Sequence, residues 1–113
     1  MVKLKGRNAI VTGAAVGLGC SYAKALAREG VNVAVCDLRE EIHEVAEILR
    51  SLGVNAASYQ GDVSDPALVR SVVDGAQEEF GSIDILVNNA GVWGASVADD
   101  DLDKSIEDYE QIV

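Results

Sequence analysis

Four short apolar runs, rich in β-branched residues, are separated by longer stretches whose apolar residues recur at helical spacing. The runs lie at residues 8–12, 31–36, 55–59 and 83–87. Two of them contain segments without polar alternation, Val33-Ala34-Val35 and Ile85-Leu86-Val87. A strand whose consecutive side chains are all apolar is buried on both faces, which is typical of a parallel sheet with helices on each side. The sequence therefore predicts an α/β domain.

The three intervening stretches have the spacing of amphipathic helices. Their expected apolar faces are Leu18, Tyr22 and Leu26, then Ile42, Val45, Ala46, Leu49 and Leu52, then Val69, Val72, Val73, Ala76 and Phe80. Gly30 and Gly53 are expected to end the first two helices, because glycine readily adopts the left-handed conformation that follows a helix. Asp65-Pro66 is expected to begin the third, with Asp65 as the cap and Pro66 in the first turn.

A fourth helix is expected from about Asp100 to the last residue, so strands and helices alternate four times along the chain. Right-handed crossovers between parallel strands then build one half of a doubly wound sheet in three layers. The predicted strand order is 3-2-1-4. We expect residues 1–113 to form a single domain.

Composition and charge exclude several classes of protein. The chain is 49% hydrophobic and 25% charged, and its apolar runs are far shorter than the roughly 20 residues that cross a bilayer. Nine basic against 19 acidic residues give a net charge of −10, so neither nucleic acid nor a membrane surface is an expected partner. The basic start leads into no long apolar stretch, which predicts no signal peptide and a cytoplasmic location. Cys20 and Cys36 are expected to be reduced and buried.

A glycine-rich stretch, Thr12-Gly13-Ala14-Ala15-Val16-Gly17-Leu18-Gly19, follows the first predicted strand and opens the first predicted helix. Glycine permits a tight turn and a close approach of the backbone to a ligand, and the N–H groups at a helix start attract an anion. This arrangement predicts a pyrophosphate site for a dinucleotide. The alternative is a plain glycine-rich turn.

Asp37 ends the second predicted strand, 18 residues after Gly19. Its carboxylate is placed to accept hydrogen bonds from the hydroxyls of an adenosine ribose, whereas a 2′-phosphate would meet like charge. NAD is therefore the expected cofactor, and NADP is less favoured. Two alternatives stay open: Asp37 caps the second helix, or Arg39 pairs with a phosphate.

Two further motifs follow later strands, Asp62-Val63 and Asn88-Asn89-Ala90-Gly91. Together with the glycine-rich stretch, they resemble the pattern of the short-chain dehydrogenase/reductase family, in the same order and on the expected loops. The resemblance implies a Rossmann-type fold and hydride transfer between a nicotinamide cofactor and an alcohol or carbonyl substrate. A complete member of that family is longer, so residues 1–113 would be its dinucleotide-binding domain, truncated before the catalytic half.

The same resemblance assigns the cofactor-binding positions. They are Gly13, Val16, Gly17, Leu18, Gly19, Asp37, Leu38, Asp62, Val63, Asn89, Ala90 and Gly91. By this assignment Asp37 and Leu38 recognise the adenosine ribose, Asp62 binds the adenine amino group, and the last three approach the nicotinamide ribose. Asn88 would tie neighbouring strands together with help from Thr12. Composition alone would make Asp62 a turn former.

No catalytic residue is assigned within the chain. The family uses a Tyr as proton donor, a Lys four residues later and a Ser upstream, but Tyr22, Tyr59 and Tyr109 are followed at that spacing by Leu26, Val63 and Val113. No metal site is predicted either, because His43 lacks partner ligands. The acidic residues 99–103 lack the glycine spacing of a calcium loop.

Two functions are consistent with these motifs. The first is the cofactor-binding part of an NAD-dependent oxidoreductase that acts on a small alcohol or carbonyl compound. Its full-length form is compatible with a homo-oligomer. The alternative is a naturally short module that binds a dinucleotide, or another chain, without catalysis. A self-sufficient module would melt cooperatively as 113 residues, whereas a fragment would melt broadly or aggregate.

Overall fold

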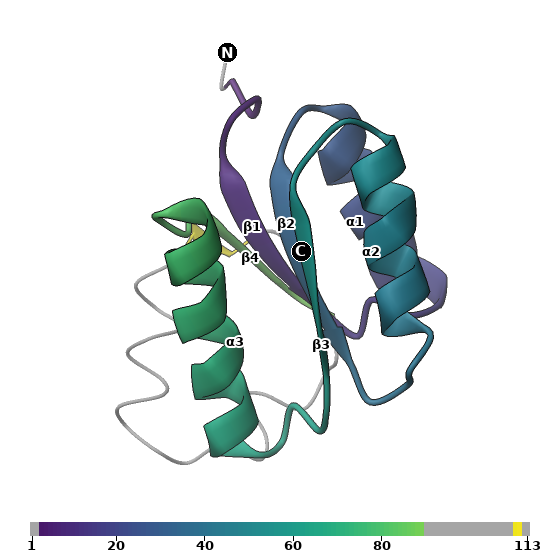
Figure 1. Cartoon of the computed structure of the whole chain (residues 1–113), viewed down its shortest axis with the longest axis vertical. Helices are drawn as coiled ribbons and strands as arrows, with labels where there is room; N and C mark the ends of the chain where they lie inside the picture. Colours follow the sequence, from purple (N-terminus) through teal and green to yellow (C-terminus); the bar gives the residue numbers. More distant parts are fainter. Residues whose placement is uncertain (1–2, 90–109, 112–113) are drawn as a thin grey trace.

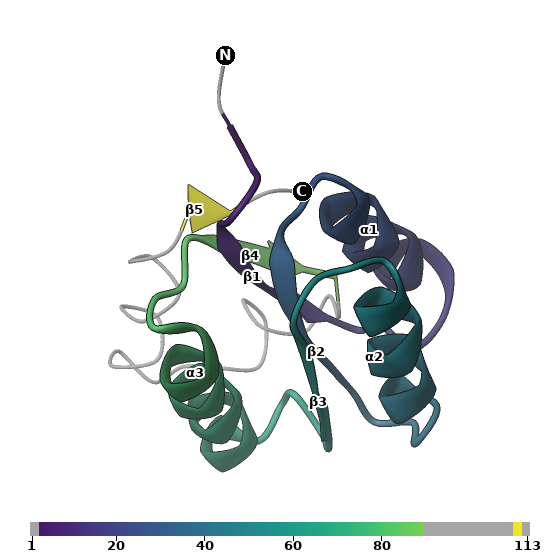
Figure 2. The same cartoon turned by 45° about the horizontal axis from the view of Figure 1, so that its top comes forward.

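A parallel sheet with helices on both faces forms the framework of the computed structural model, which describes residues 3–89 and 110–111 (Figures 1 and 2). Its elements are β1 (Asn8–Thr12), α1 (Gly17–Arg28), β2 (Asn32–Asp37), α2 (Ile42–Ser51), β3 (Ala56–Gln60), α3 (Pro66–Phe80), β4 (Ile85–Asn88) and β5 (Glu110–Gln111). The strand order is β3-β2-β1-β4-β5. The predicted α/β class and the order 3-2-1-4 are confirmed, and the three later predicted strands shift by one or two residues.

The helix predicted from about Asp100 falls mostly on residues 90–109 and 112–113, outside the described residues. For Glu110 and Gln111 the prediction is wrong, because they form β5, which pairs in parallel with β4. An outer strand exposes a row of N–H and C=O groups, and a neighbouring strand satisfies them. The pairing of β5 depends on β4, which is distant in the sequence, so the local spacing of apolar residues did not predict it.

Each central strand contributes side chains to two separate apolar clusters. Val33 and Val35 pack on the side of α1 and α2, whereas Ala34 and Cys36 pack on the side of α3. Successive residues of a strand point to opposite faces, so a strand between two helical layers needs an apolar residue at every position. Figures 1 and 2 show these layers, with α1 and α2 on one face and α3 on the other.

The expected helix boundaries agree with the structure. Gly30 and Gly53 follow the ends of α1 and α2 with φ angles of +85° and +96°, in the region that favours glycine. Asp65 caps α3, where its side chain accepts a hydrogen bond from the Ala67 N–H at 3.0 Å. None of the helices in the described part of the chain is both long and apolar enough to cross a membrane.

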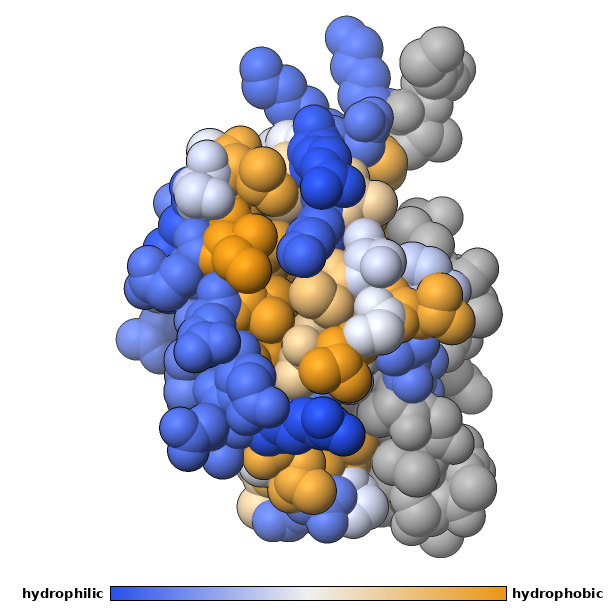
Figure 3. Space-filling view, turned by 90° about the vertical axis from the view of Figure 1, so that its right-hand side faces the viewer, coloured by the Kyte–Doolittle hydropathy of each residue, from blue (hydrophilic) through white to orange (hydrophobic). Residues whose placement is uncertain are grey.

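The predicted buried face of α1 is wrong at one position, Leu18, which is 66% exposed. Leu26 is buried and Tyr22 packs, partly buried, against the core, as expected. The other buried residues of α1 are small: Gly19, Ala23 and Ala27. Small residues let the helix lie close to the sheet: a Cβ on Gly19 would stand 2.1 Å from the carbonyl oxygen of Gly13. Leu18 and Ile48 are among the exposed apolar side chains, and Figure 3 shows the α1–α2 side as a mixture of apolar and charged surface.

A belt of hydrogen bonds ties the strands together at their amino ends. The Asn55 N–H donates to Asn32 Oδ1 at 3.0 Å, and Asn32 Nδ2 donates to Asn8 Oδ1 at 3.0 Å. The Asn8 N–H in turn donates to Asp84 Oδ2 at 2.9 Å. Asn8 is only 7% exposed, so its polar groups need these partners. The belt links the residue before β3, the strands β2 and β1, and the segment before β4.

We expect Gly19→Ala to destabilise the protein by about 1–3 kcal/mol, because an added methyl group would collide with a backbone carbonyl. Helix propensity alone predicts the opposite, a gain of roughly 0.5–1 kcal/mol. Urea unfolding would distinguish the two signs. Ser21→Ala, on the exposed side of the same helix, is the matched control and should leave the midpoint nearly unchanged. A Gly19→Ala protein as stable as the wild type would contradict the packing described above.

Candidate functional site

The carboxyl ends of the parallel strands meet at one edge of the sheet. Thr12 at the end of β1 is in register with Cys36 of β2 and with Asn88 of β4. A pocket of about 400 Å³ opens at this edge, within the size range of small-molecule sites. Its lining consists of Gly13, Val16, Asp37, Leu38, Arg39, Gly61, Asp62, Val63 and Asn89. The ligand site of a doubly wound sheet is expected at this edge.

Most of the residues predicted from the sequence gather in this pocket. The predicted residues that line it are Gly13, Val16, Asp37, Leu38, Asp62, Val63 and Asn89. Gly17, Leu18 and Gly19 form the first turn of α1 and do not line the pocket. Ala90 and Gly91 lie outside the described residues. Sequence reasoning missed Gly61, although its place directly between β3 and Asp62 was a usable signal.

The glycine-rich loop turns sharply between β1 and α1. Gly13 and Gly17 have φ angles of +62° and +63°, and a Cβ on Gly17 would meet no atom within 4 Å. Val16, the N-cap of α1, provides no side-chain acceptor for the first N–H groups of the helix. These N–H groups have no partner within a helix and carry the positive end of its dipole. The loop therefore presents hydrogen-bond donors and space to an anion.

The end of β4 holds this loop through Thr12 and Asn89. The Thr12 hydroxyl donates to Asn88 Oδ1 at 3.3 Å and accepts from the Asn89 N–H at 3.0 Å. The Asn89 side chain donates from Nδ2 to the carbonyl oxygen of Gly13 at 3.2 Å. Asn88 and Thr12 thus link adjacent strands, which agrees with the structural role that the resemblance implied.

Asp37 connects two loops at the mouth of the pocket. Its Oδ2 accepts a hydrogen bond from the Ala15 N–H at 3.1 Å, and its Oδ1 accepts one from the Arg39 N–H at 2.9 Å. The alternative interpretation of Asp37 as a helix cap is wrong, because the N-cap of α2 is Glu41, whose side chain makes no capping hydrogen bond. An ionised carboxylate has about four acceptor sites, so Asp37 keeps capacity for a ligand.

Asp62 forms a tight turn at the exposed side of the pocket. Its Oδ1 accepts hydrogen bonds from the N–H and the hydroxyl of Ser64, at 2.9 and 2.7 Å. These hydrogen bonds lower the pKa of Asp62 below its ordinary value, so the side chain is an acceptor at neutral pH. Asp62 is therefore both a turn former and a pocket residue, and the adjacent Val63 packs into the cluster beneath α3.

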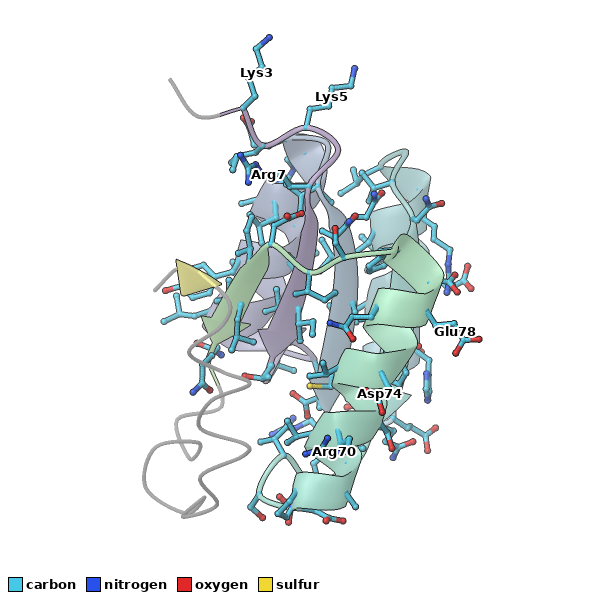
Figure 4. The ribbon with its side chains drawn as sticks, turned by 90° about the vertical axis from the view of Figure 1, so that its left-hand side faces the viewer. Lys3, Lys5, Arg7, Arg70, Asp74 and Glu78 are labelled. Atoms are coloured by element: carbon cyan, nitrogen blue, oxygen red, sulfur yellow. The ribbon has the colours of Figure 1, made fainter. Side chains whose placement is uncertain are left out.

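The charged side chains that line the pocket are mainly acidic. Asp37 and Asp62 line it together with one basic residue, Arg39. Lys3, Lys5 and Arg7 lie at the opposite end of the sheet, as Figure 4 shows. An anion bound in the pocket would therefore depend on backbone N–H groups for most of its hydrogen bonds.

The tyrosines and the histidine of the described residues lie outside the pocket. Tyr59 packs its ring against Gly75 of α3, and its pKa is raised by burial and then by the charges of Glu79 and Glu78. The exposed His43 holds its Nδ1 2.7 Å from Ser58 Oγ. Within residues 3–89 and 110–111, no three His, Cys, Asp or Glu side chains are grouped to hold a metal ion.

The sequence matches a known protein family and resembles several of its members. Residues 7–113 match the family model for short chain dehydrogenases. Oxidoreductase UcpA from Escherichia coli is 40% identical over 111 residues, which cover 95% of this chain and 42% of that protein. The 3beta-hydroxysteroid dehydrogenase 1 of Eggerthella lenta is 39% identical over 113 residues, with 97% and 42% covered. The chain thus spans well under half the length of these relatives.

Solved structures share the fold as well. The structure of NAD⁺-bound xylitol dehydrogenase is similar with a TM-score of 0.74 and 38% identity, over 80% of this chain and 35% of that one. Carveol dehydrogenase from Mycobacterium avium, solved in complex with NAD, has a TM-score of 0.74 and 32% identity, with 80% and 38% covered. Since the family match extends from residue 7 to residue 113, this chain belongs to the short-chain dehydrogenase family.

Proposed function

We propose that this chain binds the adenosine diphosphate part of NAD and serves as the nucleotide-binding domain of an oxidoreductase. The observation that carries the proposal is the pocket itself, which joins the glycine-rich loop at the start of α1 with the carboxylates of Asp37 and Asp62. Bound NAD would supply the hydride acceptor for an alcohol, or in its reduced form the hydride donor for a carbonyl compound.

The residues present fit the chemistry of this cofactor. The ribose hydroxyls and the adenine amino group are hydrogen-bond donors, and Asp37 and Asp62 present acceptors. The helix start and the loop provide N–H groups for the pyrophosphate. The 2′-phosphate of NADP would approach the negative charge of Asp37, with Arg39 as its nearest compensation. Similar dehydrogenases solved with NAD support the same choice.

We further propose that the substrate site and the catalytic groups lie in parts of the full-length protein beyond these 113 residues. The chain covers 42% of the length of UcpA, and neither Tyr22 nor Tyr59 lines the pocket. Relatives named for xylitol, carveol and a hydroxysteroid support an alcohol or its carbonyl product as the substrate class. The net charge of −10 supports a small molecule over nucleic acid or a membrane as the partner.

We expect Asp37→Ala to weaken NAD binding by about 10- to 100-fold, because hydrogen bonds to a charged acceptor would be lost. NADP binding should fall much less, since the same change removes a charge that repels the 2′-phosphate. Calorimetric titration of the full-length protein with both nucleotides measures this. Asp74→Ala, on the outer face of α3 and away from the pocket (Figure 4), is the control for charge alone. Equal losses for NAD and NADP would contradict the ribose contact.

Asp62→Ala tests the adenine contact separately. The wild-type protein should prefer NAD over nicotinamide hypoxanthine dinucleotide, whose base carries an oxygen in place of the amino group and would face the Asp62 carboxylate with an acceptor. The substitution should reduce this preference by about tenfold or more. Competition binding with the two dinucleotides gives the ratio directly. A preference that persists unchanged in Asp62→Ala would assign the base recognition to another residue.

A further inference from the structure

Asp37 belongs to β2, but one of its hydrogen bonds reaches the loop that follows β1. The Ala15 N–H donates to Asp37 Oδ2 at 3.1 Å, across 22 residues of sequence. One residue earlier on each segment, the Ala14 N–H donates to the carbonyl oxygen of Cys36 at 3.3 Å. Two consecutive residues of the glycine-rich loop are thus attached to two consecutive residues of β2, one through backbone and one through a side chain.

We propose that Asp37 is a positioning residue for the glycine-rich loop, in addition to its proposed contact with the ribose. The inference rests on the proposed function, since the loop is taken to bind a pyrophosphate. By fixing the Ala15 N–H, the carboxylate sets the direction of the chain just before Val16 and the start of α1. The loop residues that line the pocket, Gly13 and Val16, are then held in place before any ligand arrives.

The loop needs such a constraint because of its glycines. Gly13 and Gly17, on either side of Ala15, adopt positive φ angles, and glycine has more conformational freedom than any other residue. On the β4 side, Asn89 Nδ2 already holds the carbonyl oxygen of Gly13. Asp37 provides the corresponding restraint on the β2 side. A loop held from both neighbouring strands loses less conformational entropy when an anion binds.

Both roles are compatible in one carboxylate. Each oxygen of Asp37 accepts one hydrogen bond, Oδ2 from the Ala15 N–H at 3.1 Å and Oδ1 from the Arg39 N–H at 2.9 Å, and keeps a second acceptor site. The two N–H groups reach different oxygens of Asp37, and an asparagine has an NH₂ group in place of one of them, so in the same geometry only one of the two N–H groups would keep its acceptor. Asp62 offers a contrast, because its side-chain hydrogen bonds go to Ser64 of its own loop.

Amide hydrogen exchange in the ligand-free, full-length protein tests the tether directly. In Asp37→Ala the Ala15 amide should exchange at least about tenfold faster than in the wild type, because its acceptor is gone. The Val33 N–H, which bonds to the Asn55 carbonyl, reports global stability and should keep its rate. Asp62→Ala removes the same charge from the same pocket and should leave the Ala15 amide unchanged. An unchanged Ala15 rate in Asp37→Ala would overturn the proposal.

Asp37→Asn covers the case in which Asp37→Ala fails to fold. Exchange should then accelerate at one of the two amides, Ala15 or Arg39, while the other stays protected. Full protection of both amides in Asp37→Asn would overturn the tether.

Binding of 2′,3′-dideoxy-ADP separates positioning from ribose recognition, because this ligand has no ribose hydroxyls for Asp37 to accept from. Asp37→Ala should still weaken its binding by about tenfold if the loop is preorganised by the carboxylate. If the substitution acted only by removing the negative charge of Asp37, it would strengthen the binding of this anion. Unchanged or tighter binding in Asp37→Ala would overturn the positioning role. A wild-type protein that binds no ADP would contradict the proposed function, and the exchange rate of Ala15 would still decide the tether.

Discussion

The close contact between Gly19 and the carbonyl of Gly13 sets the distance between the first helix and the sheet. With no Cβ at position 19, α1 lies near the end of β1, and the loop that joins them is compressed into a short turn. The N-terminus of the helix then points to the edge where the strands end. A larger side chain at position 19 would move the helix outward and, with it, the N-cap Val16, which lines the pocket together with Asp37 and Asp62. Which residues meet at the pocket therefore depends on how closely α1 packs against the end of β1.

The two ends of the sheet differ in what their polar groups do. At the amino ends, Asn8 and Asn32 satisfy one another and the adjacent backbone, and their hydrogen bonds cross from strand to strand. At the carboxyl ends, Thr12 and Asn89 also join strands, but Asp37 and Asp62 retain acceptor sites at the pocket. Polar groups that are fully paired stabilise the fold. Those with spare capacity are available to a ligand.

Much of this arrangement was accessible from the sequence, because local pattern determined it. Apolar runs without alternation predicted the parallel sheet and its order, and Asp65-Pro66 predicted the start of α3. The spacing of large apolar residues predicted Leu18 on the buried face of α1. The helix instead packs at this end through small residues, and Leu18 is exposed. The bond from Ala15 to Asp37 and the pairing of Glu110 with β4 join distant segments, and no local pattern encodes them.

The position of Cys36 has a consequence for chemical labelling of this site. Burial, and then the neighbouring charge of Asp37, raises the pKa of the Cys36 thiol to about 12, so it is protonated at neutral pH. Because the thiolate is the reactive form, Cys36 should be inert toward alkylating probes and mild oxidants. Cys20 in α1 is only half-buried, contrary to the expectation that both thiols are buried. A thiol-reactive fluorophore would therefore attach selectively at Cys20, one residue beyond Gly19. Cys36 would remain unlabelled, so the fluorescence would report on position 20 alone.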